Sequence, residues 1–172
     1  MLVFLQNIES PAQRSKLEKL YFSCRDKMYA VAYRVLQNSH DAEDAVHQAF
    51  VRITESGARV ETMEDARAAA LAVLVTERIA IDLYRRRKRM PILPLEEEAV
   101  GLTVEYSGGN DLARCMAALP TSYRQVLLLK HHHGYTTKEI AKIMGISEWN
   151  VLKTEQRAKA KLEILCKEAE IL

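Results

Sequence analysis

Apolar residues recur at helical spacing through the first half of the chain. Between residues 15 and 36 they fall three and four positions apart, and residues 42–53 repeat this pattern on one side of a second segment. A third segment, residues 62–89, is rich in small and aliphatic side chains and ends just before Pro91. This periodicity predicts three amphipathic helices, each with a buried face, the third of them capped by Thr62.

The C-terminal part of the chain holds a more specific pattern of capping and turn residues. Thr136, followed three residues later by Glu139, has the capping-box spacing that opens a short helix. Gly145 stands where that helix must end, and Ser147 can cap a second helix that continues to about residue 169. The pattern predicts a helix-turn-helix whose second helix enters the DNA major groove, rather than two helices of an ordinary bundle.

The chain shows no strand pattern and no internal repeat, so we expect an all-α fold. Residues 91–110 contain two Pro, a Gly pair and no periodicity, which predicts a flexible linker. Short helices are expected on its C-terminal side, one starting at Asp111 and one at Pro120. Two small helical domains, residues 1–90 and 111–172, therefore flank the linker.

The distribution of charge adds a candidate nucleic-acid surface to this picture. The net charge is only +2, but residues 96–110 carry four Glu and no Lys or Arg, so two mildly basic blocks flank an acidic spacer. Five consecutive cations end the third predicted helix: Arg85, Arg86, Arg87, Lys88 and Arg89. Such a run repels itself unless a polyanion is near, which favours phosphate contact over simple capping of the helix dipole by solvated side chains.

Neither a membrane segment nor an enzyme site is expected. No apolar stretch reaches spanning length, and the apolar start of the chain lacks a basic n-region, so we expect a soluble, cytoplasmic protein without membrane insertion. Cys24, Cys115 and Cys166 form no CxxC pair, which favours buried thiols in a reducing cytosol. The histidine clusters at His40 and His131 show no partners that would orient metal ligands, so no metal or other cofactor is expected.

Three stretches of the sequence together carry a family resemblance. Residues 42–52 read AEDAVHQAFVR, residues 79–89 read IAIDLYRRRKR, and residues 119–162 hold a Leu-Pro pair, the helix-turn-helix and an Arg-Ala pair. In this order they resemble the extracytoplasmic-function (group IV) branch of the bacterial sigma-70 family. The resemblance implies a region 2-like bundle of three to four helices and a region 4-like helix-turn-helix domain, joined by the linker.

The resemblance also implies a function and a set of contact residues. It implies a sigma factor that directs core RNA polymerase to promoters, has no catalytic role, and is held inactive by an anti-sigma factor. The residues implied to contact polymerase are Asp41, Glu43, Asp44, His47 and Gln48. Those implied to contact the −10 element are Arg78, Arg85, Arg86, Arg87, Lys88 and Arg89. Those implied to contact the −35 element are Lys138, Lys142, Glu148, Trp149, Asn150, Lys153, Thr154 and Arg157.

The side chains at the start of the second helix of the helix-turn-helix suit base and phosphate contacts. Asn150 can pair bidentately with adenine, and Glu148 can accept a hydrogen bond from cytosine. Lys153 and Arg157 suit phosphates, which give affinity without sequence choice. For Trp149, packing against the preceding helix is an alternative of equal weight to DNA contact.

Departures from the family pattern leave alternative functions open. His47 replaces a usual Gln, while Leu71 and Arg78 replace an aromatic residue and an Asn that the family associates with strand separation and −10 base capture. One alternative is therefore a sigma-like regulator that binds DNA without melting it. Two others are a module that binds a protein partner through apolar helix faces and a metal-dependent nuclease that uses the His40 cluster.

Overall fold

The computed structural model describes residues 5–6, 8–56, 58–88 and 111–169, and all regular elements in these ranges are helical. The all-α prediction is therefore confirmed, with no strand in the described part of the chain. The predicted linker, residues 91–110, and Arg89 lie outside the described residues. The chain divides into two compact units, and each is described by itself.

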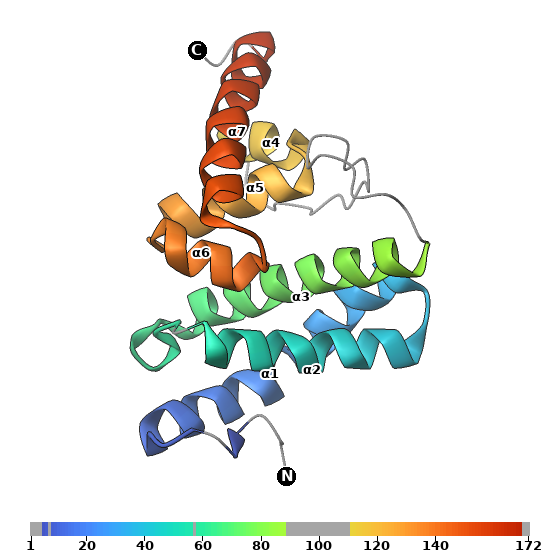
Figure 1. The fold of residues 1–172 in the computed structure, drawn as a ribbon, viewed down its shortest axis with the longest axis vertical. Helices are drawn as coiled ribbons and strands as arrows, with labels where there is room; N and C mark the ends of the chain where they lie inside the picture. Colours follow the sequence, from blue (N-terminus) through green and yellow to red (C-terminus); the bar gives the residue numbers. More distant parts are fainter. Residues whose placement is uncertain (1–4, 7, 57, 89–110, 170–172) are drawn as a thin grey trace. The chain divides into compact units, whose positions relative to one another are not determined.

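The first unit is a bundle of three long helices, α1 (Pro11–Leu36), α2 (Ser39–Glu55) and α3 (Asp65–Arg87), each packed on the other two (Figure 1). Asn38 caps α2, its side-chain oxygen accepting a hydrogen bond from the backbone N–H of Asp41 at 3.0 Å. The apolar face predicted for α2 is buried in full: Ala42, Ala45, Val46, Ala49, Phe50 and Ile53. The periodicity prediction is thus confirmed for this helix.

The predicted cap of the third helix is wrong. Thr62 closes a 3-10 turn, η2 (Val60–Thr62), and its hydroxyl donates to the carbonyl oxygen of Arg59 at 3.2 Å. The helix α3 begins only at Asp65. Val60 is buried and the turn packs on α1. The chain therefore contributes Val60 to the core before α3 starts.

The second unit is built around α7 (Glu148–Glu168), which packs on α4 (Asp111–Ala118) and α5 (Thr121–Leu127). Its core cluster contains Leu119, Tyr123, Leu127 and Ala158, with Met116, Leu162 and Leu165 packed against it. The inward face of α7 therefore carries Val151, Ala158, Leu162 and Leu165, of which the first two are fully buried. A π-helical turn, η4 (Leu128–His132), follows α5, and no local sequence pattern predicts it.

The capping pattern of the helix-turn-helix is confirmed in detail. The helix α6 (Thr137–Met144) carries a complete capping box, in which Thr136 and Glu139 satisfy each other's backbone N–H groups. Gly145 ends α6 in the left-handed conformation with φ 68°, which a side chain rarely tolerates. The Ser147 hydroxyl then accepts from the backbone N–H of Asn150 at 3.2 Å and starts α7.

Truncation of Phe50 tests the core of the first unit. Its side chain is 0% exposed and its ring lies 5.3 Å from that of Tyr21, so we expect Phe50→Ala to cost about 3–5 kcal/mol of the free energy of unfolding. Phe22 is 76% exposed, and Phe22→Ala is the matched control with an expected cost below about 0.5 kcal/mol. Urea unfolding followed by circular dichroism measures both, and equal losses would contradict this core assignment.

Candidate functional site

The first turn of α7 presents polar and aromatic side chains to solvent. Glu148 is exposed, Asn150 is half-buried, and Trp149 is 64% exposed. The Lys153 ammonium lies 4.8 Å from the centroid of the Trp149 ring, a cation–π contact between residues one turn apart. Because the indole is in solvent, the alternative that Trp149 packs against the preceding helix is wrong. The turn offers an aromatic plane, an amide and a cation on one accessible face.

Thr154 does not belong to this exposed surface, so its prediction as a DNA contact is corrected. Its side chain is only 3% exposed. Thr154 lies three residues after Val151 and four before Ala158, both fully buried. At 3.6 residues per turn these three positions share the inner face of α7, which explains the burial.

The remaining cations predicted at this site come from α6 and the middle of α7. Lys138 and Lys142 are exposed and four residues apart, which places them on one face of α6. Arg157 is half-buried on α7. These side chains supply positive charge that suits contact with phosphates.

The C-terminal end of α3 carries the second group of predicted DNA contacts. Arg86, Arg87 and Lys88 are exposed, and Arg85 is half-buried. The Arg87 guanidinium lies 2.9 Å from the carboxylate of Asp41 on α2, so its charge is partly offset. Asp41 belongs to the predicted polymerase surface, and this ion pair joins the two predicted sets of residues at one edge of the bundle.

Arg78 differs from the other α3 cations. It is buried, and its guanidinium lies 3.2 Å from Asp82 one turn later, so Asp82 is an internal partner of this side chain. The same carboxylate also affects Arg52 on α2. Burial lowers the pKa of Arg52, and the negative charge of Asp82 acts against that lowering. A buried, paired Arg78 does not form part of the exposed basic end of α3, contrary to the prediction.

The predicted polymerase contacts share the outer face of α2. Glu43, Asp44, His47 and Gln48 are exposed, whereas the apolar side of the same helix is buried. The His40 ring lies 3.9 Å from the Asp44 carboxylate at the helix start. Among the described residues no three His, Cys, Asp or Glu side chains come together as a metal site would require, and none of their helices could cross a membrane.

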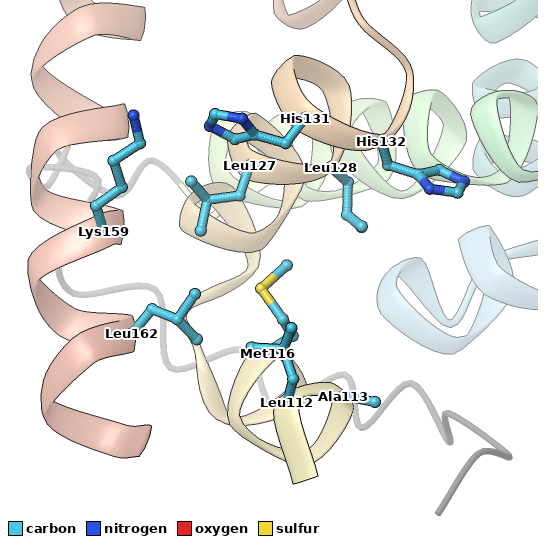
Figure 2. Close-up of a pocket in the computed structure, with 9 residues that line it drawn as sticks. All are labelled: Leu112, Ala113, Met116, Leu127, Leu128, His131, His132, Lys159 and Leu162. Atoms are coloured by element: carbon cyan, nitrogen blue, oxygen red, sulfur yellow. The ribbon is translucent and has the colours of Figure 1, made fainter. Parts of the chain in front are cut away.

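An apolar groove in the second unit was missed by reasoning from the sequence. Its volume is about 490 Å³, and Figure 2 shows α4, the end of α5 with η4, and α7 around it. Its lining residues are Leu112, Ala113, Met116, Leu127, Leu128, His131, His132, Lys159 and Leu162. The walls come from three separate elements, so no single stretch of sequence signals the groove.

A carboxylate beside this groove forms a charge cluster with two of the residues that line it, His131 and Lys159. Glu155 is nearly buried on α7, with the Lys159 ammonium at 2.6 Å and the His131 ring nitrogen at 3.4 Å. The hydrogen bond from Lys159 holds the pKa of Glu155 below its ordinary value, against the opposing effect of burial. The cluster ties η4 to α7 and so supports one wall of the groove.

Comparison with known proteins places both units in one family. Residues 20–90 match the model described as Sigma-70 region 2, and residues 109–162 match Sigma-70, region 4. The chain is 26% identical over 147 residues to the ECF RNA polymerase sigma factor SigE of Mycolicibacterium smegmatis, covering 80% of this chain and 56% of that protein.

Two further relatives give the same result. A probable RNA polymerase sigma factor, RfaY of Xanthomonas campestris, is 23% identical over 157 residues, covering 83% of this chain and 38% of that protein. The RNA polymerase sigma factor SigV of Bacillus subtilis is 26% identical over 141 residues, covering 80% and 82%. The chain thus spans about half the length of the first relative, less of the second and most of the third.

The Glu155 cluster makes stability depend on pH in a defined direction. Because the folded pKa of Glu155 is depressed, its contribution is complete above the unfolded value of 4.5 and is lost as pH falls through the folded pKa. We expect Glu155→Gln to cost about 1–3 kcal/mol at pH 7 and to flatten the loss of stability below pH 4.5.

The control for this prediction lies two turns further along α7. Glu163 forms an exposed pair with Lys167 at 2.6 Å, so Glu163→Gln removes the same kind of pair without burial. Urea unfolding across the acidic range measures wild type and both variants. Coinciding profiles for wild type and Glu155→Gln would show that the cluster contributes nothing to folding.

Proposed function

This chain belongs to the extracytoplasmic-function branch of the sigma-70 family, and from that premise we propose that it is a promoter-specificity subunit of RNA polymerase. The observation that carries the proposal is the pair of family matches in order along the chain, region 2 over the helical bundle and region 4 over the helix-turn-helix. On this proposal the protein acts in the cytoplasm, binds core polymerase and promoter DNA, and performs no catalysis itself.

The first turn of α7 reads the −35 element in the proposed complex. Residues at the N-terminus of such a helix lie nearest the base edges of the major groove. Asn150 supplies an amide for adenine, Glu148 an acceptor for cytosine, and Trp149 an exposed apolar plane. Lys153 is held against the Trp149 ring. Its side chain therefore loses less conformational entropy when it binds a phosphate.

The basic end of α3 follows the backbone of the −10 region, and the outer face of α2 contacts polymerase. Arg86 and Lys88 are the exposed cations best suited to phosphates, since Arg87 is engaged by Asp41. Glu43, Asp44 and the neighbouring polar side chains of α2 suit basic groups on a protein partner. An anti-sigma factor is a further proposed partner, on the strength of family membership alone.

Run-off transcription tests the proposal directly. Core polymerase loaded with the full-length protein is first used to select promoter DNA, which is sequenced. We expect discrete transcripts from the selected sequence and none from core polymerase alone. Polymerase binding and DNA binding without transcripts would instead support a sigma-like regulator that does not melt promoters.

A specific observation favours that second function. Leu71, at the position where the family places a strand-separating aromatic residue, is fully buried, and Arg78 is engaged with Asp82. Neither side chain is presented for stacking on an unpaired base. Permanganate reactivity of thymines at the start site distinguishes the two functions, since only a melting sigma factor exposes them.

Substitutions on α7 separate base reading from phosphate contact. We expect Asn150→Ala to reduce the preference for the selected −35 sequence by about 1–3 kcal/mol, roughly a 5- to 150-fold loss. We expect Lys153→Ala to weaken binding to all sequences and to reduce the salt slope by about one. Fluorescence anisotropy of holoenzyme on labelled promoters, at several salt concentrations, measures both.

The matched control is Lys161→Ala. Lys161 is an exposed lysine on the same helix, two turns beyond Lys153 and far from its first turn. Its removal changes net charge equally but leaves the proposed contact surface intact. Equal effects of the two lysine substitutions would point to nonspecific attraction and would count against this docking of α7.

A further inference from the structure

Two of the three cysteine thiols lie together in the second unit, and the proposed function uses neither. Cys115 is on α4 and Cys166 near the end of α7, two helices that pack on each other. They are 4% and 3% exposed, both are free, and a hydrogen bond joins their side chains. Cys24 lies in α1, where its thiol donates hydrogen bonds to the Leu20 carbonyl oxygen and the Met28 sulfur.

The thiol pair extends the core of the second unit by one turn. Cys115 on α4 lies four residues before Leu119, which directly follows that helix, and Cys166 follows Leu162 by four residues on α7. Leu119 belongs to the core cluster, and Leu162 packs against it. The two hydrogen-bonded thiols lie side by side, so a short approach of the two sulfurs reaches the disulfide length of about 2.05 Å. An eight-residue helix and the last turn of α7 are segments that can make so small a shift.

We propose that Cys115 and Cys166 are a redox modification site that forms an intramolecular disulfide on exposure to a hydroperoxide. The Cys166 thiolate attacks a peroxide oxygen, so that an S–O bond forms, the O–O bond breaks and water leaves with the thiol proton. The Cys115 thiolate then attacks the sulfenic sulfur, forming the S–S bond while the S–O bond breaks and a second water leaves. Two thiols and hydrogen peroxide give one disulfide and two waters, the sulfurs losing the two electrons that the peroxide gains.

The packing controls how fast this reaction runs. The hydrogen bond with Cys115, followed by burial, raises the pKa of the Cys166 thiol, so little thiolate is present at neutral pH. Exposed residues Lys167 and Glu168 follow Cys166, and opening of this last turn gives peroxide its access. Oxidation is therefore slow in the closed state and becomes faster as pH rises.

The bond would stabilise the second unit and leave its DNA-facing turn untouched. A cross-link between α4 and the end of α7 closes a loop of about 50 residues and restricts the unfolded chain. Cys166 lies on the order of 27 Å from Glu148 along α7, at 1.5 Å per residue. In the oxidised protein the first turn of α7 therefore stays exposed, while the rest of the second unit becomes more rigid.

Peptide mapping of the full-length protein under non-reducing conditions tests the proposal. After treatment with hydrogen peroxide we expect a loss of about 2 Da, a linked Cys115–Cys166 peptide, and a Cys24 thiol that is still alkylated once the protein is unfolded. Cys24→Ser retains this product, whereas Cys115→Ala and Cys166→Ala lose it. The melting temperature of the oxidised second unit rises on the order of 10 °C, and dithiothreitol reverses the rise.

Peptide mapping of the wild-type protein is the decisive measurement, because it does not depend on the folding of any variant. Three free thiols after treatment of the native protein would overturn the proposal. A mixture containing Cys24-linked or intermolecular disulfides would also overturn it, because only proximity in the folded second unit selects the Cys115–Cys166 pair. An unchanged or lower melting temperature would refute the stabilising role.

Discussion

The inward face of α7 is the constraint on which the rest of the second unit depends. Val151 and Ala158 are fully buried, and the helical period then decides which neighbours face solvent. With those two positions inside, Trp149 and Lys153 are presented outward, and Thr154 is drawn inward with the core. The hydrophobic effect that anchors the helix thereby also sets which side chains can reach DNA.

In the first unit, repulsion among the cations at the end of α3 has to be offset. Four described cations end α3 in sequence, a position favoured by the helix dipole but opposed by their mutual repulsion. Asp41 pairs with Arg87 and removes part of that repulsion while fixing the start of α2 beside the end of α3. The surfaces proposed for polymerase and for the −10 region thus share one ion pair.

Two of the buried charged side chains each have an oppositely charged neighbour in the folded chain. Glu155 on α7 is accommodated near the core because Lys159 and His131 contact its carboxylate. Arg78 is accommodated by Asp82 in the same way. Both charged side chains thus lie in the folded chain beside a partner of opposite charge, Lys159 for Glu155 and Asp82 for Arg78.

The sequence by itself determined the all-α class, the buried face of α2, and the capping residues Thr136, Gly145 and Ser147. These features are local, since helical periodicity, a side-chain cap and a left-handed turn each involve residues within a few positions of one another. The exposed cations of α6 and the exposed first turn of α7 follow from the same local rules.

Only the tertiary structure decided the contacts between distant segments. The pairs Asp41–Arg87 and Cys115–Cys166, and the groove between α4, α5 and α7, join residues tens of positions apart. No local pattern encodes them, because they depend on how helices of given lengths and turns pack. The same reason explains the two errors: packing of the neighbouring Val60 delays the start of α3 beyond Thr62, and Thr154 is itself buried by the elements around α7.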